Sequence, residues 1–192
     1  MAYIDIEDLR AYLGISETAD DDLLQEAVED AQSYIESQTN RRFEANTETR
    51  YYSRDAISPK DSRVLDLDDD LISITTLTNG DADSTAIAAA SYVLLPRNGA
   101  PPYHQIQLLT DVSDYWQFDT DDWVSVLGTW GYSSTPPADI VRVCTALAAY
   151  FYRQKDAQIF DTTAVLESGA LVVPQGIPAT VDRIIERYKR YI

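Results

Sequence analysis

The chain has 192 residues, of which 45% are apolar, and its formal net charge is −17 at pH 7. This length allows one large domain or two small ones, and the apolar content supports a packed core, so a wholly disordered chain is excluded. No run of 18 apolar residues occurs, so we predict no transmembrane span. The first residues, MAYIDIEDLR, are acidic and amphipathic, unlike a signal peptide.

The acidic residues are concentrated in the first two thirds of the chain. Residues 1–44 carry 12 acidic and 3 basic side chains, residues 45–137 carry 14 and 5, and residues 138–192 carry 6 and 7. A chain this acidic should not bind nucleic acid by neutralising phosphates. The charge could help DNA to slide past the protein, or it could simply keep the protein soluble. The single cysteine, Cys144, excludes an intrachain disulfide and suits synthesis in a reducing cytoplasm.

Two amphipathic helices are predicted before residue 45. Apolar residues at helical spacing run from Ile4 to Leu13, and Gly14 fits the residue at which a helix ends. Thr18 or Asp20 would begin the second helix, whose first turn carries negative charge where the helix dipole favours it. Each helix has one apolar side and therefore covers a core on that side only.

From about Thr47 to Tyr132 the hydrophobic period changes to two, which is typical of strands. Turn residues separate the candidate strands, so we predict a small antiparallel sheet, sandwich or partial barrel. Three acidic runs, Asp66–Asp70, Asp81–Asp83 and Asp111–Asp122, are expected in the loops. The candidate strands are Thr49–Ser53, Val64–Leu67, Ser73–Thr78, Ser91–Leu95, Gln105–Leu109 and Trp123–Trp130.

A central helix is predicted after Pro136 and Pro137, which suit the start of a helix. From Ile140 to Phe151 this helix is apolar on almost every side, and such a helix is normally buried all round. In a small soluble monomer that burial is hard to achieve. We therefore expect part of its surface to contact another subunit.

The last part of the chain is predicted to be less regular before a final helix. Ala164–Leu166 and Leu171–Val173 could pair as a hairpin, or the segment could be an extended arm. Pro178 would begin an amphipathic helix whose polar side is basic. Favourable interaction with the helix dipole could by itself explain these basic residues.

Together these elements predict an α+β protein. Its helical part would be a small bundle of two N-terminal helices, a buried central helix and a C-terminal helix, with an antiparallel β subdomain inserted. The predicted domains are residues 1–45 for the N-terminal helices, 46–133 for the β-rich insert, and 134–192 for the central helix, arm and C-terminal helix.

No residue pattern predicts an active site, a metal site or a cofactor. His104 is the single histidine and is expected to have a surface or packing role, while Cys144 is expected to be a small core residue. Asp66, Asp68 and Asp70 alternate, but the glycine and distal glutamate of a calcium loop are missing. Nothing fixes two carboxylates in a cleft, as glycoside hydrolysis would require.

The chain is rich in aromatic residues, with thirteen Tyr, three Trp and four Phe. Such side chains could line a ligand groove, and they are also typical of cores and protein interfaces. They keep open an alternative function, a ligand- or carbohydrate-binding β module with helical flanks. An acidic hydrolase is a third interpretation, supported only by the abundant carboxylates.

Four parts of the chain, in the same order and spacing, resemble the head–tail connector, or adaptor, proteins of tailed bacteriophages. The second of them resembles the β insert of the longer family members. The segments are LRAYLGIS and DDLLQEAVEDAQSYIESQTNRRFE; SYVLLPRNGAPPYHQIQL with VSVLGTWGYSSTPPADI; VRVCTALAAYFYRQKD; and IPATVDRIIERYKRYI.

The resemblance implies a structural protein of the virion that is not an enzyme and needs no cofactor. It implies a homo-oligomeric ring, usually of twelve subunits, bound under the portal vertex, where it joins the capsid to the tail and extends the DNA channel. The implied partners are the portal protein and a tail-proximal stopper or tail completion protein. DNA would pass without tight binding, no membrane is involved, and the protein would reach the head–tail interface after synthesis in the host cytoplasm.

The resemblance also places two contact surfaces on this chain by matching segments. The subunit interface of the ring would fall on Leu147, Tyr150, Phe151 and Arg153. Portal docking would fall on the last helix, at Arg183, Arg187, Tyr188, Lys189, Arg190 and Tyr191.

Overall fold

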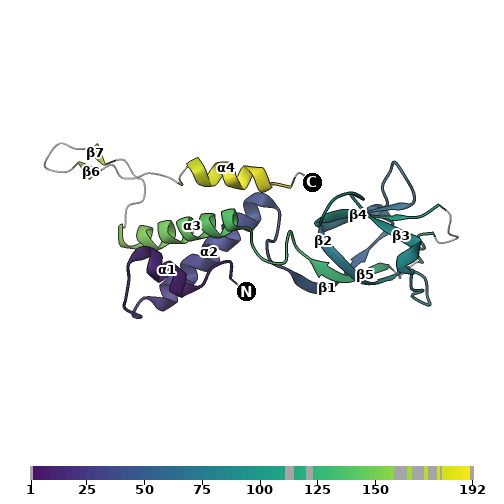
Figure 1. Cartoon of the computed structure of the whole chain (residues 1–192), viewed down its shortest axis with the longest axis horizontal. Coiled ribbons are helices and arrows are strands. Elements are labelled where there is room, and N and C mark those ends of the chain that lie inside the picture. Colours follow the sequence, from purple (N-terminus) through teal and green to yellow (C-terminus); the bar gives the residue numbers. More distant parts are fainter. Residues whose placement is uncertain are drawn as a thin grey trace. The chain divides into compact units, whose positions relative to one another are not determined.

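The computed structural model describes residues 2–110, 115–119, 123–157, 164–165, 171–172, 177 and 179–190. The chain forms two compact units. The helical unit contains Met1–Arg41 and Pro136–Ile192, and the β unit contains Arg42–Thr135. The predicted α+β fold class is confirmed (Figure 1). No helix in the described part of the chain is long and apolar enough to cross a membrane.

Four described helices build the helical unit: α1 (Ile6–Leu13), α2 (Asp21–Thr39), α3 (Ala138–Ala157) and α4 (Ala179–Tyr188). The other three helices all pack against α3 (Figure 1), as expected for a helix with so few polar residues. The apolar sides of the four helices meet in one core, which includes Leu9, Leu24, Val28, Ile35, Ile140, Val143, Leu147, Val181, Ile184 and Ile185.

The end of α1 follows the sequence signal closely. Gly14 has a φ of 72°, in the left-handed region that glycine adopts without strain. The Ile15 N–H donates a hydrogen bond to the Arg10 carbonyl at 3.0 Å, so the chain reverses while the last carbonyls of the helix stay paired. The predicted helix end is therefore confirmed.

A five-stranded antiparallel sheet forms the β unit, in the order β1-β5-β2-β4-β3. Two short 3-10 helices, η1 (Arg54–Ala56) and η2 (Ala89–Ser91), lie in the connections. The strands are β1 (Asn46–Tyr52), β2 (Val64–Thr78), β3 (Tyr92–Leu95), β4 (Tyr103–Leu108) and β5 (Val124–Trp130).

The long strand β2 corrects the predicted strand pattern. The two predicted strands Val64–Leu67 and Ser73–Thr78 belong to one strand, and the acidic run Asp66–Asp70 lies inside it instead of in a loop. The first part of β2 pairs with β4 and the second with β5, with a register shift between Asp66 and Leu71. Such a shift bends a strand and lets it serve two partners.

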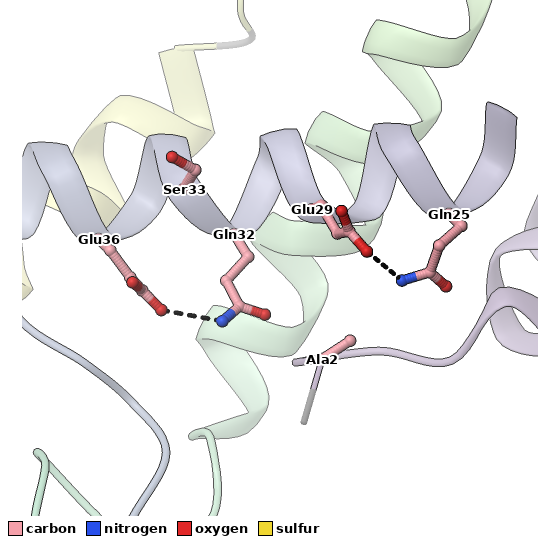
Figure 2. A pocket seen from close by; sticks show the side chains of 6 residues that line it. All are labelled: Ala2, Gln25, Glu29, Gln32, Ser33 and Glu36. Carbon is pink, nitrogen blue, oxygen red and sulfur yellow. Dashed lines mark hydrogen bonds between the residues drawn. The ribbon is translucent and has the colours of Figure 1, made fainter. Parts of the chain in front are cut away.

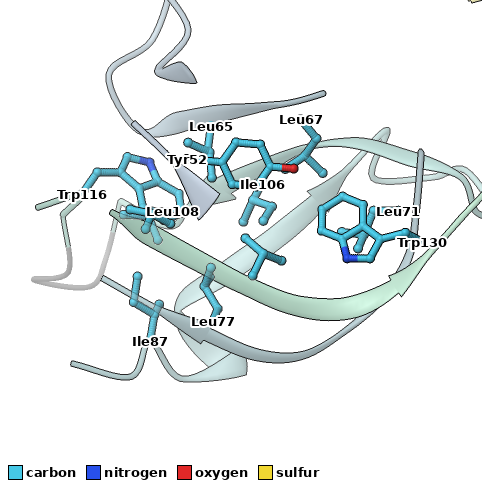
Figure 3. Close-up of a cluster of buried hydrophobic side chains, with 12 residues drawn as sticks. Tyr52, Leu65, Leu67, Leu71, Leu77, Ile87, Ile106, Leu108, Trp116 and Trp130 are labelled. Carbon is cyan, nitrogen blue, oxygen red and sulfur yellow. The ribbon is translucent and has the colours of Figure 1, made fainter. Parts of the chain in front are cut away.

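The core of the β unit lies within the curved sheet (Figure 3). Its two buried indoles are also hydrogen-bonded, because Trp116 Nε1 donates to the Arg63 carbonyl at 3.0 Å and Trp130 Nε1 donates to the Glu48 carbonyl at 3.1 Å. The core side chains are Tyr52, Leu65, Leu67, Leu71, Leu77, Ile87, Ile106, Leu108, Trp116, Val124, Val126 and Trp130.

The two short strands β6 (Ala164–Val165) and β7 (Leu171–Val172) pair antiparallel. Of the two alternatives for this segment, the hairpin is therefore the one observed. The predicted turn and the last residue of each predicted strand, Leu166 and Val173, lie outside the described residues.

Candidate assembly surfaces

The predicted subunit interface lies near the end of α3. Helical spacing of three and four residues places Leu147, Tyr150 and Phe151 on one side of this helix. Leu147 is fully buried in the core of its own unit, whereas Tyr150 and Phe151 are partly buried and Arg153 is exposed. Leu147 can therefore hold the neighbouring side chains in position by its packing in the core. Tyr150, Phe151 and Arg153 can supply the surface that contacts another subunit.

The aromatic side chains at this end of α3 have fixed partners. The Phe151 ring meets the Tyr34 ring of α2 edge-on, with centroids 6.3 Å apart. The Tyr152 hydroxyl donates to Asp20 Oδ2 at 2.7 Å, and Gln154 Nε2 donates to the Tyr150 hydroxyl at 2.7 Å. A partner would thus meet a preorganised surface and would lose little side-chain entropy on binding.

The helix α4 has one apolar and one basic side, as its sequence predicts. Val181, Ile184 and Ile185 are buried against the helical unit, while Arg183 and Arg187 are exposed. Arg187 Nη2 donates to Asp139 Oδ2 on α3 at the short distance of 2.5 Å. The basic side of α4 is therefore held in place by its apolar side and by this ion pair.

The residues after α4 are attached to the end of α2. Arg41 Nε donates to the Tyr188 carbonyl at 2.6 Å, and the Arg190 N–H donates to the Thr39 carbonyl at 2.8 Å. Asn40 Nδ2 adds a weaker bond to the Arg190 carbonyl at 3.4 Å. These anchoring residues were not predicted from the sequence, although the polar run at the end of α2 is evident in it. Tyr191, the last residue of the predicted docking set, lies outside the described residues.

The basic side chains around α4 differ in how they are held. Lys189 Nζ lies 3.6 Å from Glu186 Oε2, and Arg187 Cζ lies 5.7 Å from the centre of the Tyr188 ring. Arg142 on α3 lies 3.7 Å from Asp139, so this carboxylate faces two arginines. The result is a surface on which five basic side chains outnumber three acidic ones, Asp139, Asp182 and Glu186, on a chain that is otherwise strongly acidic.

A charged cluster in the β unit explains why the acidic run can lie in a strand. Arg50 donates to Glu48 at 2.8 Å, to Asp68 at 2.7 Å and to Asp69 at 2.8 Å, and Arg42 donates to Asp69 at 2.9 Å. The Arg50 guanidinium also lies 4.9 Å from the centre of the Trp130 ring. The carboxylates of Asp68 and Asp69 on β2 are therefore both paired with arginines. A carboxylate in a solvated loop would not need such a partner.

The cluster changes the proton affinity of its members. Burial would raise the pKa of Asp68, but hydrogen bonds from Tyr52 and Arg50 outweigh it and hold that pKa below its usual value. Burial likewise opposes the effect of Arg42 and Arg50 on Glu48, whose pKa is also lowered. The pKa of Tyr52 is raised, first by burial and then by its bond to Asp68.

His104 and Asp70 form a pair of side chains of the kind that acid–base chemistry uses. His104 lies at the start of β4, with Nδ1 3.3 Å from Oδ1 of Asp70, whose side chain is fully buried. This position corrects the loop placement of His104, while its 40% exposed side chain fits the expected surface role. In the described part of the chain, no group of three or more His, Cys, Asp or Glu side chains could hold a metal ion.

Cys144 is a core residue on α3. Its side chain is fully buried, and burial raises the pKa of its thiol to about 12. The reactive thiolate is therefore scarce at neutral pH, so this residue fits the predicted packing role and not that of a nucleophile.

A shallow polar groove runs along the outer side of α2 (Figure 2). Gln25 Nε2 donates to Glu29 Oε1 at 2.8 Å, and Gln32 Nε2 donates to Glu36 Oε1 at 2.9 Å. These amides already engage the two carboxylates, so the groove offers a polar contact surface and no obvious reaction centre. Its lining residues are Ala2, Gln25, Glu29, Gln32, Ser33 and Glu36.

The aromatic residues that could have lined a ligand groove are divided between the core and the surface. Tyr52, Trp116 and Trp130 are buried in the β unit, whereas Tyr51 and Trp123 are exposed. Three of these aromatic side chains are therefore used for packing in the core of the β unit.

The family model of phage gp6-like head-tail connector proteins matches residues 3–76 of this chain. The predicted resemblance to head–tail connectors is confirmed. The match covers α1, α2, β1 and most of β2, while the later elements lie outside it. The family description names a head-tail connector, which agrees with the prediction of a structural protein at the head–tail interface of a virion.

Solved structures resemble this chain over almost its whole length. One chain from the neck of an empty GTA particle, computed with C6 symmetry, has a TM-score of 0.65 at 17% identity, covering 99% of this chain and 91% of that one. A chain from the virion of a native gene transfer agent (GTA) particle has a TM-score of 0.66 at 20% identity, with the same coverage.

A third chain comes from the neck of a native GTA particle computed with C12 symmetry. Its TM-score is 0.59 at 19% identity, covering 97% of this chain and 88% of that chain. At such identities the likeness establishes a shared fold. Among curated proteins, none matches the sequence.

Proposed function

We propose that this chain is a structural virion protein that forms a ring under the portal vertex, joins the capsid to the tail and extends the DNA channel. The observation that carries the proposal is the shared fold with chains of GTA necks over 99% of this chain, combined with the connector family match at its N-terminal part. The C6 and C12 symmetry named for two of those necks supports a ring of several copies, with twelve as the expected number.

The charge of the chain suits the wall of a DNA channel. A net charge of −17 per copy repels phosphates, so a ring of many copies gives DNA little to bind at physiological salt. Weak binding is useful in a channel, because DNA must leave the capsid without stopping. The ring then works by holding its protein partners in place, and no chemical step is involved.

Contacts between neighbouring helical units would use the end of α3. Tyr150, Phe151 and Arg153 offer the preorganised aromatic and basic surface, and Leu147 supports it from the core. Tyrosine and arginine are enriched where protein interfaces gain most of their binding energy. The ring contacts belong in this proposal to residues 1–45 and 134–192, and the insert of residues 46–133 adds a separate surface.

Portal docking would use the basic side of α4 and the residues after it. Arg183, Arg187, Lys189 and Arg190 present positive charge beside Tyr188, and Tyr191 follows them in the sequence. Arginine pairs bidentately with carboxylates, so an acidic portal surface would bind here selectively. The tail-proximal stopper or tail completion protein would bind the ring on another surface.

Electron microscopy of the chain mixed with the portal protein of its own particle tests the proposed function. We expect a ring of subunits on the portal with an open central channel. A chain that stays unbound and monomeric at all concentrations, or that binds DNA tightly without the portal, would contradict the proposal.

The docking surface can be tested without removing α4, whose buried side chains stabilise the helical unit. The double change Arg183→Glu with Lys189→Glu should weaken portal binding at least tenfold and reduce its dependence on salt. Lys60→Glu with Arg97→Glu is the matched control, because it changes the net charge equally at exposed positions of the β unit. Equal loss of binding in both variants would show that only the net charge matters.

A further inference from the structure

One face of the β unit is a regular array of uncharged side chains. The register of β1, β5 and β2 places outward-facing residues in three rows across the three strands. Alternation along the strands puts the buried residues of β5, such as Val124 and Val126, on the opposite face. The rows are Tyr51–Ser125–Thr78, Thr49–Leu127–Thr76 and Thr47–Thr129–Ser73.

Two large aromatic side chains stand at one end of this array. Tyr51 is 63% exposed, and Trp123, which directly precedes the buried Val124 at the start of β5, is 52% exposed. The hydroxyl groups of Thr78 and Ser125 lie 2.6 Å apart, so they satisfy each other along the first row. We call these ten residues, the three rows with Trp123, the neutral face.

The neutral face contrasts with the rest of the β unit. Residues 42–135 carry 15 acidic and 6 basic side chains, a net charge of −9, yet none of the ten side chains of the neutral face is charged. Exposed Tyr and Trp on a flat uncharged surface are typical of a protein contact, and nucleic acid would require basic residues instead.

We propose that the neutral face is the surface through which the β unit binds a second copy of this chain. The inference rests on the proposed ring, which brings several copies together. Any second copy is itself strongly acidic, so contact through a charged part of the β unit would bring like charges together and cost several kcal/mol. The neutral face avoids this repulsion, and the polar side-chain groups that it has to desolvate are hydroxyl groups and the indole N–H of Trp123.

The size of the neutral face sets what it can contribute. Its strands span about 20 Å along their length and about 15 Å across, roughly 300 Å² in all. A stable interface usually buries about 800 Å² on each partner. The neutral face is thus one part of the contact between copies, and the helical unit supplies the rest.

A photocrosslinking experiment identifies the occupant of this face. Trp123 is replaced by the photoreactive residue benzoylphenylalanine in the full chain, which is then assembled on the portal protein and irradiated. We expect a product of twice the 21.5 kDa mass of the chain, with both peptides from this protein. Crosslinks only to the portal or to a tail protein, or none in an assembled ring, would overturn the proposal.

A charge variant measures how much the face contributes. Tyr51→Glu with Trp123→Glu should raise at least tenfold the protein concentration needed for rings to form on the portal. Tyr12→Glu with Tyr115→Glu is the matched control, because those tyrosines are 61% and 64% exposed and lie outside the neutral face. Equal losses in the two variants would contradict the proposal.

The experiment distinguishes failure of this proposal from failure of the proposed function. If the proposed function is wrong, the unmodified chain also forms no ring on the portal. If the double glutamate variant fails to fold, Thr49→Lys with Thr76→Lys replaces it. These exposed strand positions tolerate a long polar side chain, yet lysine would place charge at the centre of the neutral face. Normal ring formation by the folded lysine variant would count against the proposal.

Discussion

The helical unit and the β unit handle charge in opposite ways. In the helical unit the core is almost entirely apolar, and most charged side chains point away from it. In the β unit a strand carries four aspartates in a run of five residues, and Arg42 and Arg50 pair with two of them beside the buried Trp130. Helices can therefore be predicted from the spacing of apolar residues alone. A strand can contain charged residues wherever partners distant in the sequence neutralise them, so its position is harder to predict.

The two units can be followed separately in one sample. All three tryptophans lie between residues 42 and 135, so tryptophan fluorescence reports on the β unit. Four of the helices lie in the other unit, so the helical circular dichroism signal reports on that one. Variants in either unit can therefore be assigned to the region they disturb.

Leu147→Asp should have the largest effect and should act on the helical unit. The side chain is fully buried, so the change places an unpaired charge in the core and should cost about 4 kcal/mol or more. Chemical denaturation followed by helical circular dichroism measures it. Ala138→Asp, at the exposed start of the same helix, is the control and should cause no loss. A Leu147→Asp chain as stable as the parent would refute the central position of α3.

Gly128→Ala should come next and should act on the β unit. A Cβ at this position would lie 2.4 Å from the Ser73 backbone oxygen of the neighbouring strand, so the sheet would have to shift, at a cost of about 2 kcal/mol. Denaturation followed by tryptophan fluorescence measures the loss. Thr129→Ala on the outward side of β5 should change stability by less than about 1 kcal/mol. Equal costs for the two changes would show that β2 and β5 do not approach so closely.

Arg50→Met tests whether the charged cluster stabilises the sheet. The change keeps an apolar side chain beside Trp130 and removes the bonds to Glu48, Asp68 and Asp69, which should cost about 1 to 2 kcal/mol. Lys60→Met at an exposed loop position is the control, with an expected change near zero. An unchanged midpoint for Arg50→Met would mean that solvent screens the pairs completely.

Acidification should produce the smallest effect, again in the β unit. The pKa values of Asp68 and Glu48 are lowered in the folded protein from ordinary values of 3.8 and 4.5. The resulting stabilisation is complete above those ordinary values and is lost as the pH falls through the lowered ones. Tryptophan-detected stability should therefore fall below about pH 4.5, and less steeply in Arg50→Met. If the stability of the parent and of Arg50→Met fell in parallel with pH, Arg50 would not be the cause of the lowered pKa values of these carboxylates.

Much of the helical unit could be predicted from the amino-acid sequence. Apolar spacing, the glycine at residue 14 and the nearly unbroken apolar surface of α3 predicted its helices and its central member, because helix formation depends on residues three and four positions apart. The period of two likewise predicted an antiparallel sheet. The basic side of α4 was also visible, because it too is a local pattern.

The position of the acidic run within β2 depends on contacts between residues that are distant in the sequence. Asp68 and Asp69 are stabilised by Arg42 and Arg50, which lie 18 to 27 residues away in the chain, so no local pattern could place these carboxylates in a strand. The position of Leu147 also depends on the tertiary structure: this residue was predicted for the subunit interface, and its side chain is fully buried in the core of the helical unit. The neutral face arises from the register of three strands distant in sequence, since register is set by pairing and packing across the whole sheet.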